Sequence, residues 1–115
     1  MIDDVRLQDL QLIMKDDFPD LIEIFIEDSL SRSEDLKNLL AESPIDSVAV
    51  RNNAHTLKGS SGNLFATRLQ DMYMSLEKLA GEMDLDEVGD LMSKIDKESH
   101  VVFDELKSFN SNLNV

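Results

Sequence analysis

Apolar residues recur along this chain at helical spacing, and polar breaks divide the pattern into five segments. An acidic pair followed by Phe18-Pro19 suits the free amides of a helix N-terminus, Ser43-Pro44 repeats that signal, and Gly81 ends a segment. The predicted helices cover about residues 4–15, 18–41, 45–64, 67–80 and 84–109, followed by a frayed tail.

The apolar positions of each segment predict which helix face is buried. The short first helix carries Val5, Leu10, Ile13 and Met14. The second carries a stripe of Phe18, Ile22, Phe25, Ser29, Leu36 and Leu40. The last carries Leu85, Val88, Met92, Ile95, Val102, Leu106 and Phe109. Because short connections join long amphipathic helices, we predict an all-α fold: an antiparallel, up-and-down four-helix bundle with the short first helix as a lid.

The composition adds limits to this prediction. A length of 115 residues, with no internal repeat or linker, predicts a single domain over residues 1–115. The absence of cysteine excludes disulfides, thiolate metal sites and a cysteine nucleophile. Apolar runs are too short for a membrane-spanning helix, and the N-terminus lacks the pattern of a signal peptide. We therefore expect a cytoplasmic protein without a membrane partner.

Charge is distributed unevenly. The net charge of −13 argues against nucleic acid as a partner, because the phosphates would be repelled. Between Ser47 and Gly81, however, four basic side chains stand against two acidic ones. This only locally basic stretch contains His55.

Helical geometry predicts that His55 is exposed. In the third helix a narrow arc of core positions is formed by Val50, Ala54, Leu57, Ser61 and Leu64. At 100° per residue His55 lies roughly 140° from the centre of that arc. The outward face beside it comprises Val48, Arg51, Asn52, Lys58, Gly59 and Gly62, and we expect Val48, Arg51, Asn52 and the two glycines to contact a partner.

The neighbours of His55 suit a histidine that meets another macromolecule. Gly59 and Gly62 each lower helix stability by roughly 1 kcal/mol relative to alanine, and they would clear the surface beside the ring. Lys58, one turn away, is placed to pair with an anionic group carried by the imidazole. A plain alternative remains on periodicity alone: a solvated histidine, with glycines that are tolerated defects or serve close helix contacts.

The run His55-Thr-Leu-Lys-Gly-Ser-Ser61 resembles the H-x-L-K-G-[SA]-[SA] signature of histidine-containing phosphotransfer (HPt) domains. The chain length, the number of helices, the position of the motif in the third helix and the Leu76-Glu77 pair also fit. The resemblance spans essentially the whole chain. It implies a four-helix bundle that carries a phosphoryl group on histidine between aspartates of receiver domains.

The resemblance assigns roles residue by residue. His55 matches the phosphorylated histidine, Lys58 the residue that contacts the phosphoryl group, and Gly59 the position kept small for access. Glu77 matches the residue that accepts a hydrogen bond from the imidazole, which would fix the tautomer and leave Nε2 toward the partner. One position departs: the family often has glycine where this chain has Phe65, which should alter the turn into the fourth helix or lay an aromatic ring on its surface.

The implied function is that of a phosphorelay intermediate. His55 would accept phosphate from a receiver aspartate of a hybrid sensor kinase and pass it to a response regulator. The receiver would supply the aspartate and Mg²⁺, so this chain would be a monomeric phosphocarrier that needs no cofactor of its own and is not an enzyme. Val48 and Met74 are candidate apolar docking residues, although Met74 is equally explained as an ordinary exposed methionine.

Other interpretations have less support. A non-phosphorylated adaptor that binds receivers is the main alternative, but it would be free to lose His55, Lys58 and Glu77. A metal site is not expected, because His100 is far from His55 in sequence and the acidic run after Asp84 lacks the ligands of a calcium loop. The sequence identifies neither kinase nor regulator, and Met1 favours a free-standing carrier.

Overall fold

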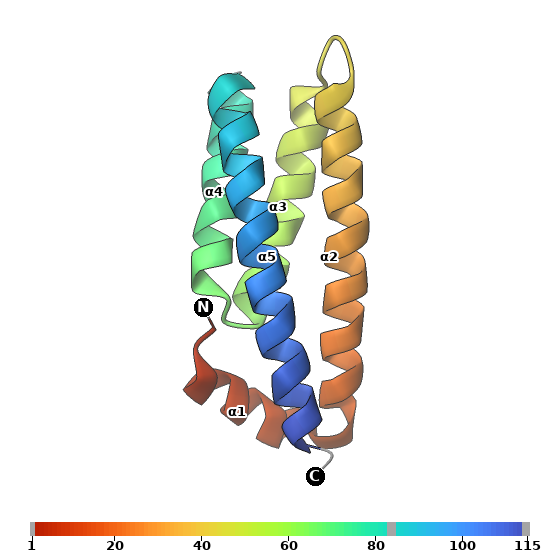
Figure 1. The fold of residues 1–115 in the computed structure, drawn as a ribbon, viewed down its shortest axis with the longest axis vertical. Helices are drawn as coiled ribbons and strands as arrows, with labels where there is room; N and C mark the ends of the chain where they lie inside the picture. Colours follow the sequence, from red (N-terminus) through yellow and green to blue (C-terminus); the bar gives the residue numbers. More distant parts are fainter. Residues whose placement is uncertain (1, 83–84, 114–115) are drawn as a thin grey trace.

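The computed structural model describes residues 2–82 and 85–113, and every regular element in them is helical. The elements are α1 (Asp4–Met14), a 3₁₀ turn η1 (Lys15–Asp17), α2 (Phe18–Ala41), α3 (Ser47–Asn63), α4 (Thr67–Glu82) and α5 (Leu85–Leu113). Figure 1 shows α2 to α5 side by side, with α1 across one end. This confirms the predicted helical bundle. Within the described residues, no helix has the length and apolar character needed to cross a membrane.

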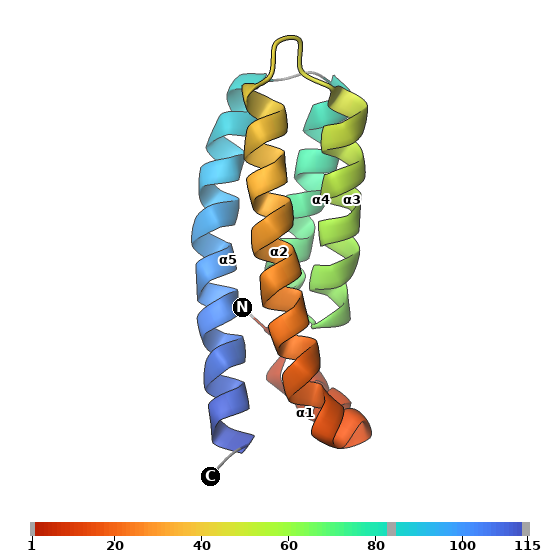
Figure 2. The same cartoon turned by 90° about the vertical axis from the view of Figure 1, so that its right-hand side faces the viewer.

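The four long helices form an elongated bundle of 49 × 20 × 20 Å. Helix α3 packs most extensively against α4, α4 packs against α5, and α2 packs more loosely against α3 and α5. Among the described residues no Cα atom of α3 lies within 8 Å of one of α5, and Figure 2 shows these two helices on opposite sides. A residue on the outer face of α3 is therefore remote from α5.

The predicted core stripes are confirmed in α2, α3 and α5. The third-helix residues Val50, Ala54, Leu57, Ser61 and Leu64 are all buried. The stripes of α2 and α5 are also buried, with Leu40 and Phe109 partly exposed at their ends. The side chain of Leu85 lies outside the described residues.

Half of the apolar face predicted for α1 is confirmed: Leu10 and Met14 pack against the core, whereas the prediction is wrong for Val5 and Ile13. Val5 and Ile13 are 70% and 78% exposed, whereas Leu7 is 1% exposed. The buried side of α1 is formed by Leu7 with the partly buried Leu10 and Met14, spaced by three and seven residues. Because a short helix that lies across the end of a bundle buries only one narrow face, the apolar side chains of Val5 and Ile13 stay exposed.

Helix ends also differ from the prediction. Helix α3 begins at Ser47 because the Asp46 carboxylate accepts a hydrogen bond from the Ala49 N–H at 3.0 Å, a side-chain N-cap. Helix α4 continues through Gly81 to Glu82, and α5 continues to Leu113 rather than ending near 109. The predicted first residue of the last helix, Asp84, lies outside the described residues.

The turn between α3 and α4 explains how the chain accommodates Phe65. Phe65 has a φ of 60°, the left-handed conformation that favours glycine. Its N–H bonds to the Gly62 carbonyl, and the Ala66 N–H bonds to the Ser61 carbonyl, both at 3.0 Å, which is the paired pattern of a Schellman helix end. The usual glycine turn is thus retained without glycine.

The N-terminal segment covers this turn. The Asp3 N–H donates to the Phe65 carbonyl at 3.1 Å, and the Arg6 guanidinium lies over the Phe65 ring at 6.0 Å from its centroid. Cation–π attraction and the added hydrogen bond offset the left-handed backbone. The bulky residue therefore lies against α1, as an aromatic ring on the surface of the turn.

Substitutions at Phe65 test this turn. Phe65→Gly and Phe65→Ala both remove the ring, but only alanine keeps a Cβ in the left-handed conformation, so we expect the glycine variant to be more stable by about 1 kcal/mol in chemical denaturation. At Ser75, exposed inside α4, the same pair should reverse, with alanine more stable by about 1 kcal/mol. Equal stabilities at Phe65 would contradict a left-handed turn.

Candidate functional site

His55 lies in the middle of α3, and its side chain is 65% exposed. Ala54 and Leu57, its neighbours on the buried face, are both 0% exposed. The core thus fixes the rotation of α3, and this rotation presents the imidazole to the outside, as helical geometry predicts.

A single carboxylate from α4 links the imidazole to the nearby lysine. Glu77 Oε1 lies 3.1 Å from His55 Nδ1, and Glu77 Oε2 lies 3.0 Å from Lys58 Nζ. Glu77 and Lys58 are largely covered, with side chains 24% and 23% exposed. The structure therefore brings together the three residues to which the sequence assigned the chemistry.

This contact determines the state of the ring. A carboxylate can only accept hydrogen bonds, so Nδ1 carries the proton that points to Glu77. In the neutral imidazole Nε2 is then unprotonated and has a free lone pair. The arrangement can supply a nucleophilic nitrogen at the protein surface.

Electrostatics hold the Glu77 carboxyl in its charged form. The hydrogen bond from Lys58, with the charge of that lysine and the bond to His55, lowers the pKa of Glu77 against the opposing effect of burial. Glu77 in turn neutralises Lys58 in the resting protein. Lys58 is therefore not a free cation. The positive charge of the basic stretch is reduced further because Arg68 Nε lies 3.6 Å from Glu98 Oε1.

The two glycines beside His55 have different surroundings. A Cβ added at Gly59 would meet no atom within 4 Å, which agrees with an open surface next to the ring. A Cβ added at Gly62 would lie 2.6 Å from Nε2 of Gln70 on α4. The interpretation of Gly62 as clearance for a partner is therefore replaced by a close helix contact. Sequence reasoning missed Gln70, because only the packed structure shows which side chain faces Gly62.

The other candidate contact residues lie exposed along the same region. Val48 and Met74 are 55% and 51% exposed, and Arg51 and Asn52 are exposed on α3. On α3 these residues precede His55 by three, four and seven positions, and helical geometry places them on its side of the helix. Their role in binding stays a prediction.

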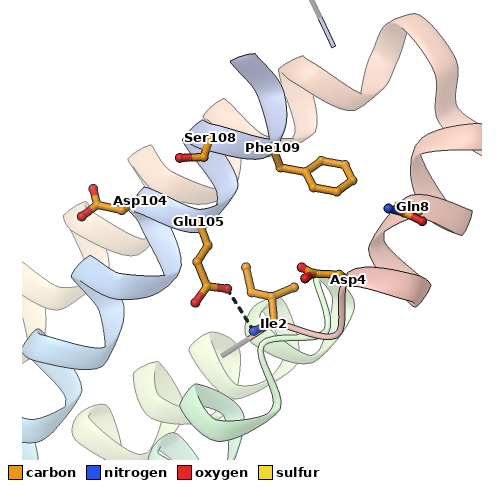
Figure 3. Close-up of a pocket in the computed structure, with 7 residues that line it drawn as sticks. All are labelled: Ile2, Asp4, Gln8, Asp104, Glu105, Ser108 and Phe109. Atoms are coloured by element: carbon orange, nitrogen blue, oxygen red, sulfur yellow. Dashed lines mark hydrogen bonds between the residues drawn. The ribbon is translucent and has the colours of Figure 1, made fainter. Parts of the chain in front are cut away.

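The site is an exposed surface, and a large hollow lies elsewhere. Between the start of the chain and the C-terminal half of α5 there is a hollow of about 630 Å³, lined by Ile2, Asp4, Gln8, Asp104, Glu105, Ser108 and Phe109. The Ile2 N–H donates to Glu105 Oε2 at 3.2 Å, a bond between two of the lining residues that Figure 3 shows. His100 is exposed on α5, across the bundle from α3, so the structure does not bring the two histidines together. In the described part of the chain, no three His, Asp or Glu side chains are grouped to hold a metal ion.

Comparison with known proteins places this geometry in a family. The family model for the Hpt domain matches residues 20–108. The crystal structure of histidine-containing phosphotransfer protein B (HptB) from Pseudomonas aeruginosa PAO1 is similar, with 31% identity, coverage of 96% of this chain and 95% of that one, and a TM-score of 0.89. Histidine-containing phosphotransfer protein ZmHP2 from maize shares the fold at 20% identity, with coverage of 92% and 86% and a TM-score of 0.84. No curated protein sequence gives a significant match.

The Glu77 contact predicts a specific pH dependence of stability. Because its pKa is lowered in the folded state, the interaction contributes above the ordinary glutamate pKa and is lost as pH falls through the lower folded value. We expect Glu77→Gln to lower the free energy of unfolding at neutral pH by at most about 1 kcal/mol after solvent screening.

That difference should shrink as pH falls below the ordinary glutamate pKa of about 4.3, where the carboxyl of the unfolded chain is protonated first and that of the folded protein only at lower pH. Urea denaturation from pH 7 to about pH 2.5 would measure it, a range of about 4.5 pH units that includes the glutamate pKa. Glu82→Gln, at an exposed glutamate of the same helix, is the control and should leave the pH profile unchanged. A wild-type minus Glu77→Gln difference that stays constant with pH would contradict the carboxylate bridge.

Proposed function

This chain belongs to the histidine-containing phosphotransfer (Hpt) domain family, and from that premise we propose that His55 carries the phosphoryl group of a two-component phosphorelay. The protein is a phosphotransfer protein of two-component signalling. The finer proposal is that His55 receives phosphate from a receiver aspartate of a hybrid sensor kinase and gives it to the receiver of a response regulator. The observation that carries it is the hydrogen bond of Glu77 to Nδ1 of an exposed histidine.

The chemistry needs little from this chain beyond positioning. The Nε2 lone pair attacks the phosphorus of an aspartyl phosphate, an N–P bond forms, and the P–O bond to the aspartate breaks so that the aspartate leaves as a carboxylate. No proton has to leave Nε2, because Glu77 holds the ring proton on Nδ1. The ring gains positive charge in this step, and the adjacent Glu77 carboxylate stabilises it.

Lys58 would change partner during the transfer. In the resting state its ammonium bonds to Glu77 Oε2. A phosphoryl group on Nε2 offers new anionic oxygens one helical turn away, and Lys58 can contact these by rotating its flexible side chain. Glu77 then retains its bond to Nδ1. The divalent cation for phosphoryl transfer belongs, in this proposal, to the receiver domain.

His55, Lys58 and Glu77 contact one another within a single chain, which supports the proposal of a monomeric carrier. Gly59 adds an open surface at the same place. The receiver would approach over this glycine, with Val48, Arg51, Asn52 and Met74 as candidate contacts around the ring.

Labelling tests the assignment of His55. The protein is incubated with Mg²⁺ and with receiver domains of the same genome that have been charged with labelled acetyl phosphate. The stability of the phosphoryl label on the protein is then measured in acid and in alkali. We expect acid-labile, alkali-stable label on wild type, its loss in His55→Gln, and its retention in the matched control His100→Gln. Label that persists in His55→Gln would refute the proposal. Receiver binding without any label would favour the adaptor function.

Gly59 provides a second test, in which stability and function change in opposite directions. Because an added Cβ meets nothing within 4 Å, Gly59→Ala should raise the free energy of unfolding by up to about 1 kcal/mol. The methyl group would stand beside the ring and slow phosphoryl transfer from the receiver several-fold. Gly89→Ala, in an equally open position on α5, should give the same stability gain with unchanged transfer. Equal transfer rates in both variants would refute access over Gly59.

A further inference from the structure

A groove opens between α2 and α3 directly beside the His55 face. Its volume is about 540 Å³, and it follows the loose packing between these two helices. Most of its lining residues are polar or charged, and they come from the C-terminal end of α2 and the first half of α3: Arg32, Asp35, Asn38, Leu39, Glu42, Ala49, Asn52, Asn53 and Thr56.

The wall of the groove holds an acceptor without a donor. Asn53 Nδ2 donates to the Arg32 carbonyl at 3.1 Å, which fixes the orientation of the amide because a carbonyl cannot donate. Asn53 Oδ1 is then buried, and no hydrogen-bond donor in the described residues reaches it. Because this oxygen is buried, its unpaired carbonyl dipole adds negative potential to the groove wall and is not itself open to an occupant.

The charge at the groove is negative and uncompensated. Asp35 and Glu42 are exposed and form no ion pair within the described residues, whereas Arg32 is already bound to Asp28 at 3.0 Å. The negative end of the α2 dipole and the positive end of the α3 dipole meet at this groove and oppose each other, so the charge there comes from the carboxylates. Asp35 and Glu42 therefore favour a cationic occupant.

The groove is continuous with the proposed site. Asn52 and Thr56, which line it, precede and follow His55 by three positions and one position on α3. A domain that brings its phosphoryl group to His55 must cover this part of α3. The groove thus lies within reach of the edge of that domain.

We propose that this groove receives a cationic side chain, best an arginine, from the receiver domain docked on His55, and that it selects among receivers. The inference rests on the proposed function and names the contact that would decide which partner is accepted. A guanidinium carries five donors on a planar group, which suits a cleft lined by amide and carboxylate oxygens. Receivers lacking a basic side chain at that edge would leave the carboxylates unpaired and bind less tightly.

The test compares two pairs of substitutions with the same change in net charge. Asp35→Asn with Glu42→Gln neutralises the groove, and Asp90→Asn with Asp104→Asn neutralises two exposed acids on α5, which lies across the bundle from α3. The probe is the receiver domain of the same genome that binds the wild-type protein most tightly in calorimetry. Its dissociation constant is measured by calorimetry at several salt concentrations, together with KM and kcat of transfer.

We expect the groove variant to raise the dissociation constant and KM by about 5–10-fold at low salt, with kcat at saturation retained, because partner binding and not the imidazole is altered. The α5 variant should bind as wild type does. Equal weakening in both variants, or in neither, would overturn the inference. Because calorimetry needs no transfer, binding that weakens only in the groove variant supports the inference even if labelling fails, whereas failed labelling itself overturns the proposed function.

Discussion

The site depends on one carboxylate, that of Glu77 on α4, which accepts hydrogen bonds from two side chains of α3. Glu77 contacts His55 Nδ1 through one oxygen and Lys58 Nζ through the other, at 3.1 and 3.0 Å. Hydrogen bonds of this length hold only within a few tenths of an ångström. The orientation of the imidazole therefore requires that α3 and α4 keep a fixed rotation and register relative to each other.

The relative rotation of α3 and α4 is fixed on their buried faces, opposite the exposed histidine. Fully buried side chains on both helices fix their rotation, among them Leu57 and Leu76. The turn that joins the helices is closed by Phe65 in the left-handed conformation and covered by the Asp3–Arg6 segment. A part of the chain distant in sequence thus supports the geometry of the site through the turn, without touching the imidazole.

The residues that position the imidazole differ from those that we propose to select the receiver domain. At the ring the resting site is nearly neutral, since Lys58 is paired, and Gly59 leaves it open. This arrangement agrees with a group that must meet different receiver domains in turn. Charge is concentrated instead at the flank, where Asp35 and Glu42 line the α2–α3 groove. A common chemical centre with a selective edge would allow one carrier to distinguish its partners without changing the transfer step.

The sequence by itself determined the features that depend on local helical geometry: the bundle, the buried stripes of three helices, and the exposure of His55 on the face opposite Ala54 and Leu57. Periodicity predicts these because a helix repeats every 3.6 residues whatever its neighbours are. The tertiary structure alone decided the buried face of α1, the contact of Gly62 with α4, and the left-handed Phe65. Each of these depends on which side chain of another element occupies the adjacent space, and one chain segment read alone does not contain that information.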